Sequence, residues 1–268
     1  MKTLKTLLYM LMVVVLAQSC KEKIDLDVPG AEPKVVIESE VTTETDSSYV
    51  KITKTADFYS TDPYPVIASA SVNVNGVPFN YVGEGVYRPA AGYKGVTGTV
   101  YNLDITAEGQ KYTSSAVLEP MYRIDSLYQV YKEKEGFMDA GWAIYYIGFD
   151  ARPRTKYTYF RIGYFDTIVH HDSLDNSKIL FNNTETVINQ EYHFELPFTR
   201  YKMGEECVMI FRSVTKEMSD FIAAYSAQTD GAPGPFQVPP ANLPSNIKGG
   251  AIGYFATYDV VRKRYKVK

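Results

Sequence analysis

The stretch Ala70-Ser71-Val72-Asn73-Val74-Asn75-Gly76-Val77 decides the fold class of this chain of 268 residues. Its valines alternate with polar residues, a period of two that puts apolar side chains on one face of a β-strand and polar ones on the other. Asn75-Gly76 is typical of a two-residue type I′ turn, which joins antiparallel strands. The stretch therefore predicts a half-buried β-hairpin.

The same period of two recurs from Val35 to Val117. Val50 and Ile52 alternate with polar neighbours, and Glu108-Gly109 is a second two-residue turn between alternating segments. About seven short strands separated by turn residues are typical of a β-sandwich. We expect residues 34–118 to form a sandwich of the immunoglobulin or transthyretin-like kind, with Tyr59 to Pro65 as a loop inside it.

A second β-rich domain is expected at residues 119–268, beginning after Glu119-Pro120. Its strands are longer and richer in aromatic residues, which favour β-structure. The clearest of them are Ala143 to Phe149, Lys156 to Phe165, Glu191 to Leu196 and Val208 to Phe211.

One helix interrupts these strands, at residues 215–228. Its single apolar stripe consists of Met218, Phe221, Ile222 and Tyr225, which recur at helical spacing. Thr215 is a suitable N-cap, and a Pro-rich loop at 231–244 follows the helix. A helix this short is marginal alone in water, so we expect the stripe to pack on a sheet, on strands such as Val208 to Phe211.

The first residues have the layout of a secretory signal. Lys2 and Lys5 precede an apolar run from Leu7 to Ala17 that is too short to span a bilayer. The run ends close to Cys20, as in a bacterial lipobox, where the cysteine is acylated and becomes the first mature residue. We therefore predict a lipoprotein signal peptide at 1–19 and a polar tether at 20–33; the alternative is a plain secreted protein with an incidental cysteine.

Lipidation of Cys20 would hold the mature protein on a membrane, because each buried methylene contributes about 0.8 kcal/mol. Loss of Lys2 and Lys5 with the signal peptide changes the net charge from −3 to −5, so nothing indicates binding of nucleic acid. Cys207 is the other cysteine, and it lies in an apolar run. We expect it to be a buried, inert thiol.

Four features of the mature chain occur together. They are the strand Val35 to Glu38, the junction Ile124-Asp125-Ser126, the helix with its Pro-rich loop, and the ending Asn246-Ile247-Lys248-Gly249-Gly250 to Gly253-Tyr254-Phe255. Together they resemble the Bacteroidota lipoprotein family named domain of unknown function 4249. The resemblance implies no known activity, cofactor or catalytic residue, but it implies an outer-membrane location and a TonB-dependent transporter as partner.

Acidic residues follow the predicted lipidation site. Glu22, Asp25 and Asp27, interrupted by Lys23, resemble the surface-export signals of Bacteroidota lipoproteins. This resemblance favours the cell surface over the periplasmic face of the outer membrane.

No catalytic motif stands out, since the chain has no Gly-x-Ser-x-Gly elbow, phosphate loop, dinucleotide fingerprint or His-Glu-x-x-His helix. His170, Asp172 and His193 are weak candidates for zinc ligands, and Asp172, Asp175 and Asn176 for calcium, but neither spacing matches a known pattern. A polar hairpin loop is the better explanation of residues 170–176.

The 23 tyrosines raise the possibility of a sugar-stacking platform, although tyrosine is also an ordinary strand former. The triplets at Ser126, Thr167 and Ser173 resemble the Asp-Ser/Thr-aliphatic O-glycosylation motif of Bacteroidota, with Ser126 expected to be the least accessible.

Three functions remain open at this point. The first is a non-catalytic outer-membrane lipoprotein that assists a TonB-dependent transporter. The second is a glycan- or peptide-binding surface module that works alone. The third is a metal-dependent hydrolase built on His170, Asp172 and His193.

Overall fold

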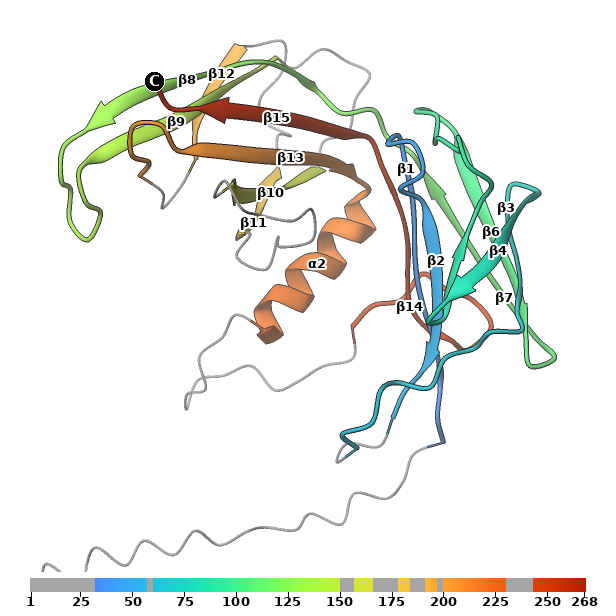
Figure 1. The fold of residues 1–268 in the computed structure, drawn as a ribbon. Coiled ribbons are helices and arrows are strands. Elements are labelled where there is room, and N and C mark those ends of the chain that lie inside the picture. The colour runs from blue at the N-terminus through green and yellow to red at the C-terminus, as the bar shows by residue number, and fades with distance from the viewer. Residues whose placement is uncertain are drawn as a thin grey trace, which may run out of the picture. The chain divides into compact units, whose positions relative to one another are not determined.

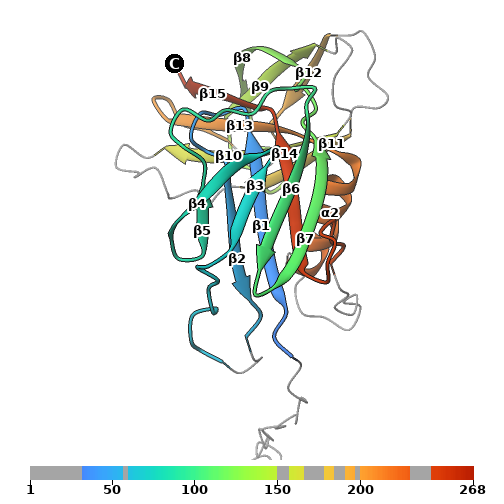
Figure 2. The same ribbon diagram turned by 90° about the vertical axis from the view of Figure 1, so that its right-hand side faces the viewer.

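The computed structural model describes residues 32–56, 60–149, 157–165, 178–183, 191–196, 200–229 and 243–268. Residues Pro33–Lys268 form one compact unit. Within the described ranges it contains fifteen strands and a single helix, which confirms the mainly β fold (Figures 1 and 2). No helix in these ranges has the length and apolar character that crossing a membrane requires.

The first sheet has eight strands in the order β14-β1-β2-β5-β4-β3-β6-β7. Strand β4 pairs with β3 through Val77 to Phe79 and with β5 through Asn80 to Gly83, so the sheet turns from one layer into another along β4. The bounds are β1 Val35–Thr42, β2 Tyr49–Lys54, β3 Ser71–Val74, β4 Val77–Gly83, β5 Val86–Arg88, β6 Val100–Ala107, β7 Gln110–Val117 and β14 Ile252–Tyr258.

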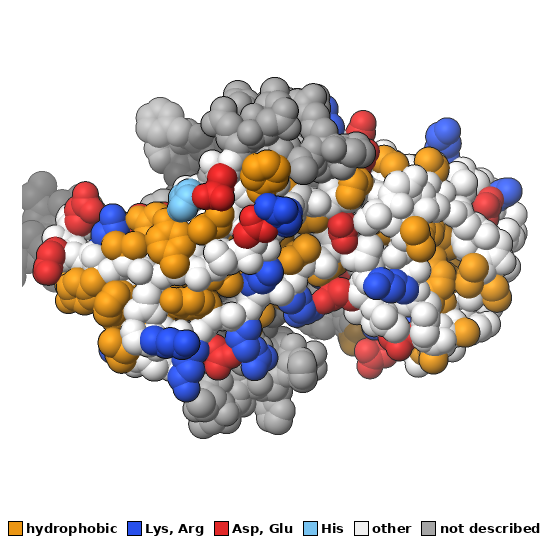
Figure 3. All heavy atoms as spheres, turned by 90° about the horizontal axis from the view of Figure 1, so that it is seen from above, with side chains coloured by type: hydrophobic (Ala, Val, Ile, Leu, Met, Phe, Trp, Pro, Cys, Tyr) orange, Lys and Arg blue, Asp and Glu red, His pale blue; other side chains and the backbone are white. Residues whose placement is uncertain are grey.

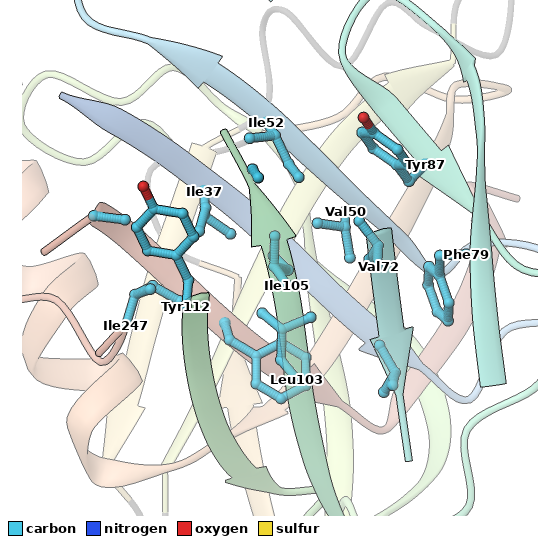
Figure 4. Close-up of a cluster of buried hydrophobic side chains, with 14 of the residues drawn as sticks. Ile37, Val50, Ile52, Val72, Phe79, Tyr87, Leu103, Ile105, Tyr112 and Ile247 are labelled. Atoms are coloured by element: carbon cyan, nitrogen blue, oxygen red, sulfur yellow. The ribbon is translucent and has the colours of Figure 1, made fainter. Parts of the chain in front are cut away.

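The two layers of this sheet enclose the first hydrophobic core. Figure 4 shows Ile37 and Ile52 on one layer and Leu103, Ile105 and Tyr112 on the other, all almost completely buried. The alternation seen in the sequence is what places these side chains inward, because successive residues of a strand point to opposite faces. The strands β1 to β7 correspond to the seven short strands that the sequence predicts.

Tight turns occur where the sequence predicts them. Asn75 and Gly76 have φ of 49° and 80°, and Glu108 and Gly109 have 51° and 78°, the left-handed values of a type I′ turn. A third turn of this kind, Glu84-Gly85 with φ of 51° and 78°, joins β4 to β5 and was not predicted.

Strand β14 pairs in parallel with β1, which the sequence analysis did not anticipate. It comes from the part of the chain assigned to the second domain, yet it completes the sheet of the first. The division into domains 34–118 and 119–268 stays a prediction. Strand β14 belongs to the second range by sequence and to the sheet of the first range by pairing. The pairing needs Gly253, because a Cβ at that position would lie 2.0 Å from the carbonyl oxygen of Ile37.

Two smaller sheets form the other half, in the orders β11-β10-β13-β15 and β12-β9-β8. Their facing sides meet in a second core, in which the rings of Tyr146 and Phe211 contact edge to face at 5.0 Å. The bounds are β8 Arg123–Lys132, β9 Gly141–Phe149, β10 Tyr157–Phe165, β11 Lys178–Asn183, β12 Glu191–Glu195, β13 Glu206–Val214 and β15 Val260–Lys266.

Cys207 lies in this second core and is fully buried. Burial raises the pKa of its thiol to about 11, so it stays protonated at neutral pH. The prediction that Cys207 is buried is confirmed, and the raised pKa agrees with the expectation of an inert thiol.

Helix α2, Lys216–Thr229, begins after Thr215, whose hydroxyl accepts a hydrogen bond from the Met218 amide at 3.3 Å. The helix packs on Val214 at the end of β13, the strand of the predicted surface, and also on Tyr254, Ala256 and Tyr258 of β14, which was not predicted. Met209 and Phe211 of β13 belong to the second core. Residues 231–242 of the predicted Pro-rich loop lie outside the described residues.

A polar joint ties the two halves together. The carboxylate of Asp259 accepts hydrogen bonds from the Thr43 hydroxyl at 2.9 Å and from the Met121 amide at 2.8 Å. The buried Ser213 hydroxyl donates to the carbonyl of Glu119 at 2.6 Å and accepts from the Asp259 amide at 2.8 Å. These bonds satisfy polar groups at the point where the chain passes between the cores.

Candidate functional site

Most of the predicted site residues lie outside the described part of the chain. This applies to Cys20, Thr167, His170, Asp172 and Ser173. His193 and Ser126 are described. Ser126 is exposed on β8; its accessibility relative to Thr167 and Ser173 stays a prediction, because those two residues lie outside the described part of the chain.

His193 is an exposed residue of β12. Its Nδ1 lies 3.0 Å from the Tyr128 hydroxyl and its Nε2 lies 3.1 Å from a carboxylate oxygen of Glu191. Among the described residues, no three histidine, cysteine, aspartate or glutamate side chains are close enough together to hold a metal ion. His193 therefore contacts a tyrosine and a carboxylate here, and its relation to His170 and Asp172 is not described.

The outer side of the sheet β12-β9-β8 carries a group of aromatic side chains. Strand register places Tyr128 and Glu195 on either side of Tyr145. The rings of Tyr128 and Tyr145 stack, with centroids 5.0 Å apart and planes at 14°, and His193 contacts Tyr128 edge to face at 5.6 Å. We call Tyr128, Tyr145, His193 and Glu195 the aromatic face.

Charged groups fix one side of the aromatic face. Glu195 accepts a hydrogen bond from the Tyr145 hydroxyl and another from Arg200 Nη1 at 3.0 Å, and Lys132 Nζ lies 4.0 Å from it. Burial opposes ionisation of Glu195, but the bond from Tyr145 and the nearby cations outweigh it and lower the pKa of the carboxyl. The bond to Glu195, together with burial, raises the pKa of Tyr145, so the pair is a carboxylate and a neutral phenol at neutral pH.

Hydrophobic side chains also gather on the exterior of this half. Figure 3, which views the molecule from above, shows them in a broad group over the region of β8 and β9, with acidic and basic side chains between and around them. Contiguous apolar exposure of this kind is more typical of an interaction surface than scattered single residues are.

The end of the β8–β9 hairpin is a second distinct surface. Phe137, in the turn closed by the Glu135–Met138 bridge, is completely exposed, and Tyr131 is half exposed. Paired backbone hydrogen bonds of 2.9 Å between Trp142 and Tyr201 hold the turn containing Met203 beside the same hairpin, and Met203 is 62% exposed. We call Phe137, Met203 and Tyr131 the apolar tip.

A groove lies between α2 and the outer side of β14, β1 and β2. Its volume is about 710 Å³, and its lining is mainly aliphatic and aromatic. Pockets that bind small molecules commonly have volumes of about 300–1,000 Å³ and apolar walls with a few polar groups.

The sequence analysis missed all three surfaces for one reason. The stacked pair Tyr128 and Tyr145 and the approach of Met203 to the hairpin depend on which strands become neighbours. A period of two identifies a strand but not its partner. One of these surfaces could have been suspected from the sequence, because Gly136-Phe137 places a large apolar residue beside a glycine in a polar turn.

Comparison with known proteins identifies the family. The sequence profile of the family described as "Domain of unknown function (DUF4249)" matches residues 21–264. A search of curated proteins finds no match.

Proposed function

Because the chain belongs to the DUF4249 family, whose description gives no activity, we propose its function from its own residues: a non-catalytic outer-membrane lipoprotein that assists a TonB-dependent transporter in capturing or admitting substrate. In this proposal Cys20 carries the lipid, residues 21–34 lead to the first strand, and the protein stands on the cell surface. The apolar tip contacts the partner.

The exposed Phe137 carries this proposal. Its side chain makes no contribution to either hydrophobic core, and exposing a phenylalanine at the end of a hairpin has no folding benefit. Aromatic residues and methionine are enriched where proteins meet other proteins, and buried aromatic anchors supply most of the binding energy. Phe137, with Met203 exposed on a turn held beside the same hairpin, suits such an anchor.

The position of the tip adds a second argument. In Figure 1 the β8–β9 hairpin and the beginning of β1 lie at opposite sides of the Pro33–Lys268 unit. A lipid attached ahead of β1 would leave the hairpin end clear of the attachment point, where another protein can reach it. Lys134, Glu135 and Asp139 surround Phe137, and this polar rim favours a protein partner over a lipid surface.

Co-purification from detergent-extracted outer membranes tests the proposal. The tagged protein should bring down a TonB-dependent transporter, and the double variant Phe137→Ser, Met203→Ser should bring down at least about tenfold less, a loss of about 1.4 kcal/mol in binding. Val96→Ser is the control, since Val96 is as exposed as Met203, at 62%, but lies on the other half. Absence of any transporter with the unaltered protein contradicts the proposal, and equal recovery with the double variant excludes the tip as the contact.

The aromatic face favours a second function, a glycan- or peptide-binding module that works alone. Stacked tyrosines beside a carboxylate and two cations can pack against a sugar ring and bind its hydroxyls. A glycan array read with the unaltered protein and with Tyr128→Ala tests it, with Tyr64→Ala as control for an exposed tyrosine elsewhere. Binding that Tyr128→Ala abolishes and Tyr64→Ala keeps would support this function, and a blank array would reject it for the glycans tested.

A further inference from the structure

The groove beside α2 combines a mainly apolar lining with an exposed carboxylate, that of Glu38. Its floor is the outer side of β14, β1 and β2, and its wall is the helix. The helix covers β14 well, because the Phe221 and Tyr254 rings lie 4.9 Å apart and Tyr254, Ala256 and Tyr258 are buried. It does not cover β1, where Glu38 is exposed, nor the end of β14, where Ile252 is 39% exposed.

The apolar part of the groove comes from three separate elements. Val36 and Ile252 contribute from the sheet, Phe221 and Tyr225 from the helix, and Leu243 from the segment that leads into β14. Side chains converging from three directions present an apolar concavity to a ligand, where a flat sheet would present one face. At about 710 Å³ the space suits a small molecule.

Glu38 is an exposed charged residue on the floor of the groove. Its neighbour on the same face, Glu40, has an ion pair with Arg212 at 3.1 Å, and both of those side chains are mostly buried. Glu38 forms no ion pair or hydrogen bond within the described residues, and Lys51, its cross-strand neighbour on β2, does not pair with it. An ionised carboxylate only accepts hydrogen bonds, so its natural partner is a cation or a strong donor.

Tyr254, another residue of the lining, has an enclosed hydroxyl. The side chain is more than nine-tenths buried, and its hydroxyl makes no hydrogen bond of ordinary geometry within the described chain. Burial raises the pKa of Tyr254 to about 12, against a smaller opposing effect of the Thr215 hydroxyl, so it stays a neutral phenol. Tyr254 therefore adds no charge to the groove.

We propose that this groove is a binding site for a small amphipathic amine, with the apolar body against Val36, Ile252 and Phe221 and the cationic head at Glu38. Charge complementarity decides the sign of the head, since Glu38 is a carboxylate on β1, the central strand of the floor, that forms no ion pair within the described residues. Lys34 also lines the groove, but it lies four positions before Glu38 along extended chain, on the order of 13 Å away. The site is independent of the apolar tip, so each proposal can fail without the other.

Three probes of matched shape test the inference: 4-phenylbutylamine, 4-phenylbutanol and 4-phenylbutyrate, each titrated into the purified full-length protein by saturation-transfer NMR. The amine should bind most tightly, because Glu38 attracts its ammonium group. The carboxylate should bind at least about tenfold more weakly than the amine, because Glu38 repels it. Failure of all three probes to bind, or equal binding of all three, overturns the proposal.

Two variants locate the site. Glu38→Gln keeps the shape and removes the charge, so it should reduce amine binding to the level of the alcohol; Glu84→Gln, an exposed carboxylate in the β4–β5 turn, is the matched control and should change nothing. Ile252→Trp fills the groove and should weaken all three probes together. Amine binding that survives both Glu38→Gln and Ile252→Trp in folded protein, checked by circular dichroism, contradicts the proposal.

Discussion

Gly253 shows at the scale of one residue how close the parallel strands β14 and β1 must come. With φ of +117° it occupies a conformation that disfavours other residues, and an added Cβ would lie 2.0 Å from the carbonyl oxygen of Ile37. The clashing atom belongs to the backbone, which cannot rotate away as a flexible side chain can. A larger residue at position 253 therefore requires one of the two strands to move.

Gly253→Ala should therefore cost about 3 kcal/mol or more in the free energy of unfolding. The control is Gly83→Ala, because Gly83 has a similar φ of +121° but nothing within 4 Å of its would-be Cβ. It should cost about 1 to 2 kcal/mol, from backbone strain alone. Urea titrations measure both, and equal losses would mean that the close approach to Ile37 has no energetic consequence.

Cys20 is the residue on which membrane attachment depends in our proposal. Cys20→Ser removes the acylation site, so the protein should leave the membrane fraction and become soluble. Fractionation followed by immunoblotting measures this, with Cys207→Ser as the control cysteine, which should stay in the membrane fraction. If Cys20→Ser remains on the membrane, lipidation of Cys20 is not what holds the protein there.

At the scale of elements, the helix α2 depends on tertiary contacts. Phe221 packs on the Tyr254 ring but is only partly buried, so its removal leaves a smaller void than a fully buried ring would. We expect Phe221→Ala to cost about 2 kcal/mol, below the roughly 3 to 5 kcal/mol of a fully buried phenylalanine.

Thermal denaturation checks this value, and Tyr225→Ala, at a position 48% exposed on the same helix, should cost less than half as much. Rapid hydrogen exchange of the Phe221 amide in the unaltered protein, or no loss with Phe221→Ala, would show that the helix is not held by this contact.

The elements themselves were largely predictable. Alternation identified the strands on either side of Asn75-Gly76 and Glu108-Gly109, and helical spacing identified α2, because these signals are local in the sequence. The packing of α2 on β14 and the pairing of β14 with β1 were not predictable. Both depend on contacts across much of the chain, which no local pattern records.

At the scale of the whole molecule, the two cores are joined by more than a linker. Strand β14 adds to the first sheet while β13 and β15, its neighbours in sequence, belong to another. The joint around Asp259 and Ser213 adds hydrogen bonds between the same regions. Neither core can lose its structure without removing partners from the other.

We therefore expect the described unit to unfold in a single cooperative transition. Scanning calorimetry of the full chain should give one peak, with the calorimetric enthalpy equal to the van't Hoff enthalpy. Ser213→Ala should lower the melting temperature without splitting the peak, because buried groups of Glu119 and Asp259 lose their partner. Two separate peaks in the unaltered protein would show that the halves are independent domains.

The candidate surfaces were much less predictable than the fold. The exposure of Phe137 results from a turn that points it away from both cores, and the stacking of Tyr128 on Tyr145 results from strand register. The sequence supplied the residue types, and only the arrangement of the strands brought them together. The groove beside α2 likewise combines segments from 34–49, 218–225 and 243–258.

Site-specific photocrosslinking at Phe137 in intact outer membranes tests the proposed role most directly. Phe137→p-benzoylphenylalanine puts a reactive group at the end of the apolar tip without truncating the aromatic side chain, and the same change at Val96 is the control. We predict a crosslink from position 137, and not from position 96, to a TonB-dependent transporter, identified by mass spectrometry. No crosslink from position 137, or the same products from both positions, would contradict the account.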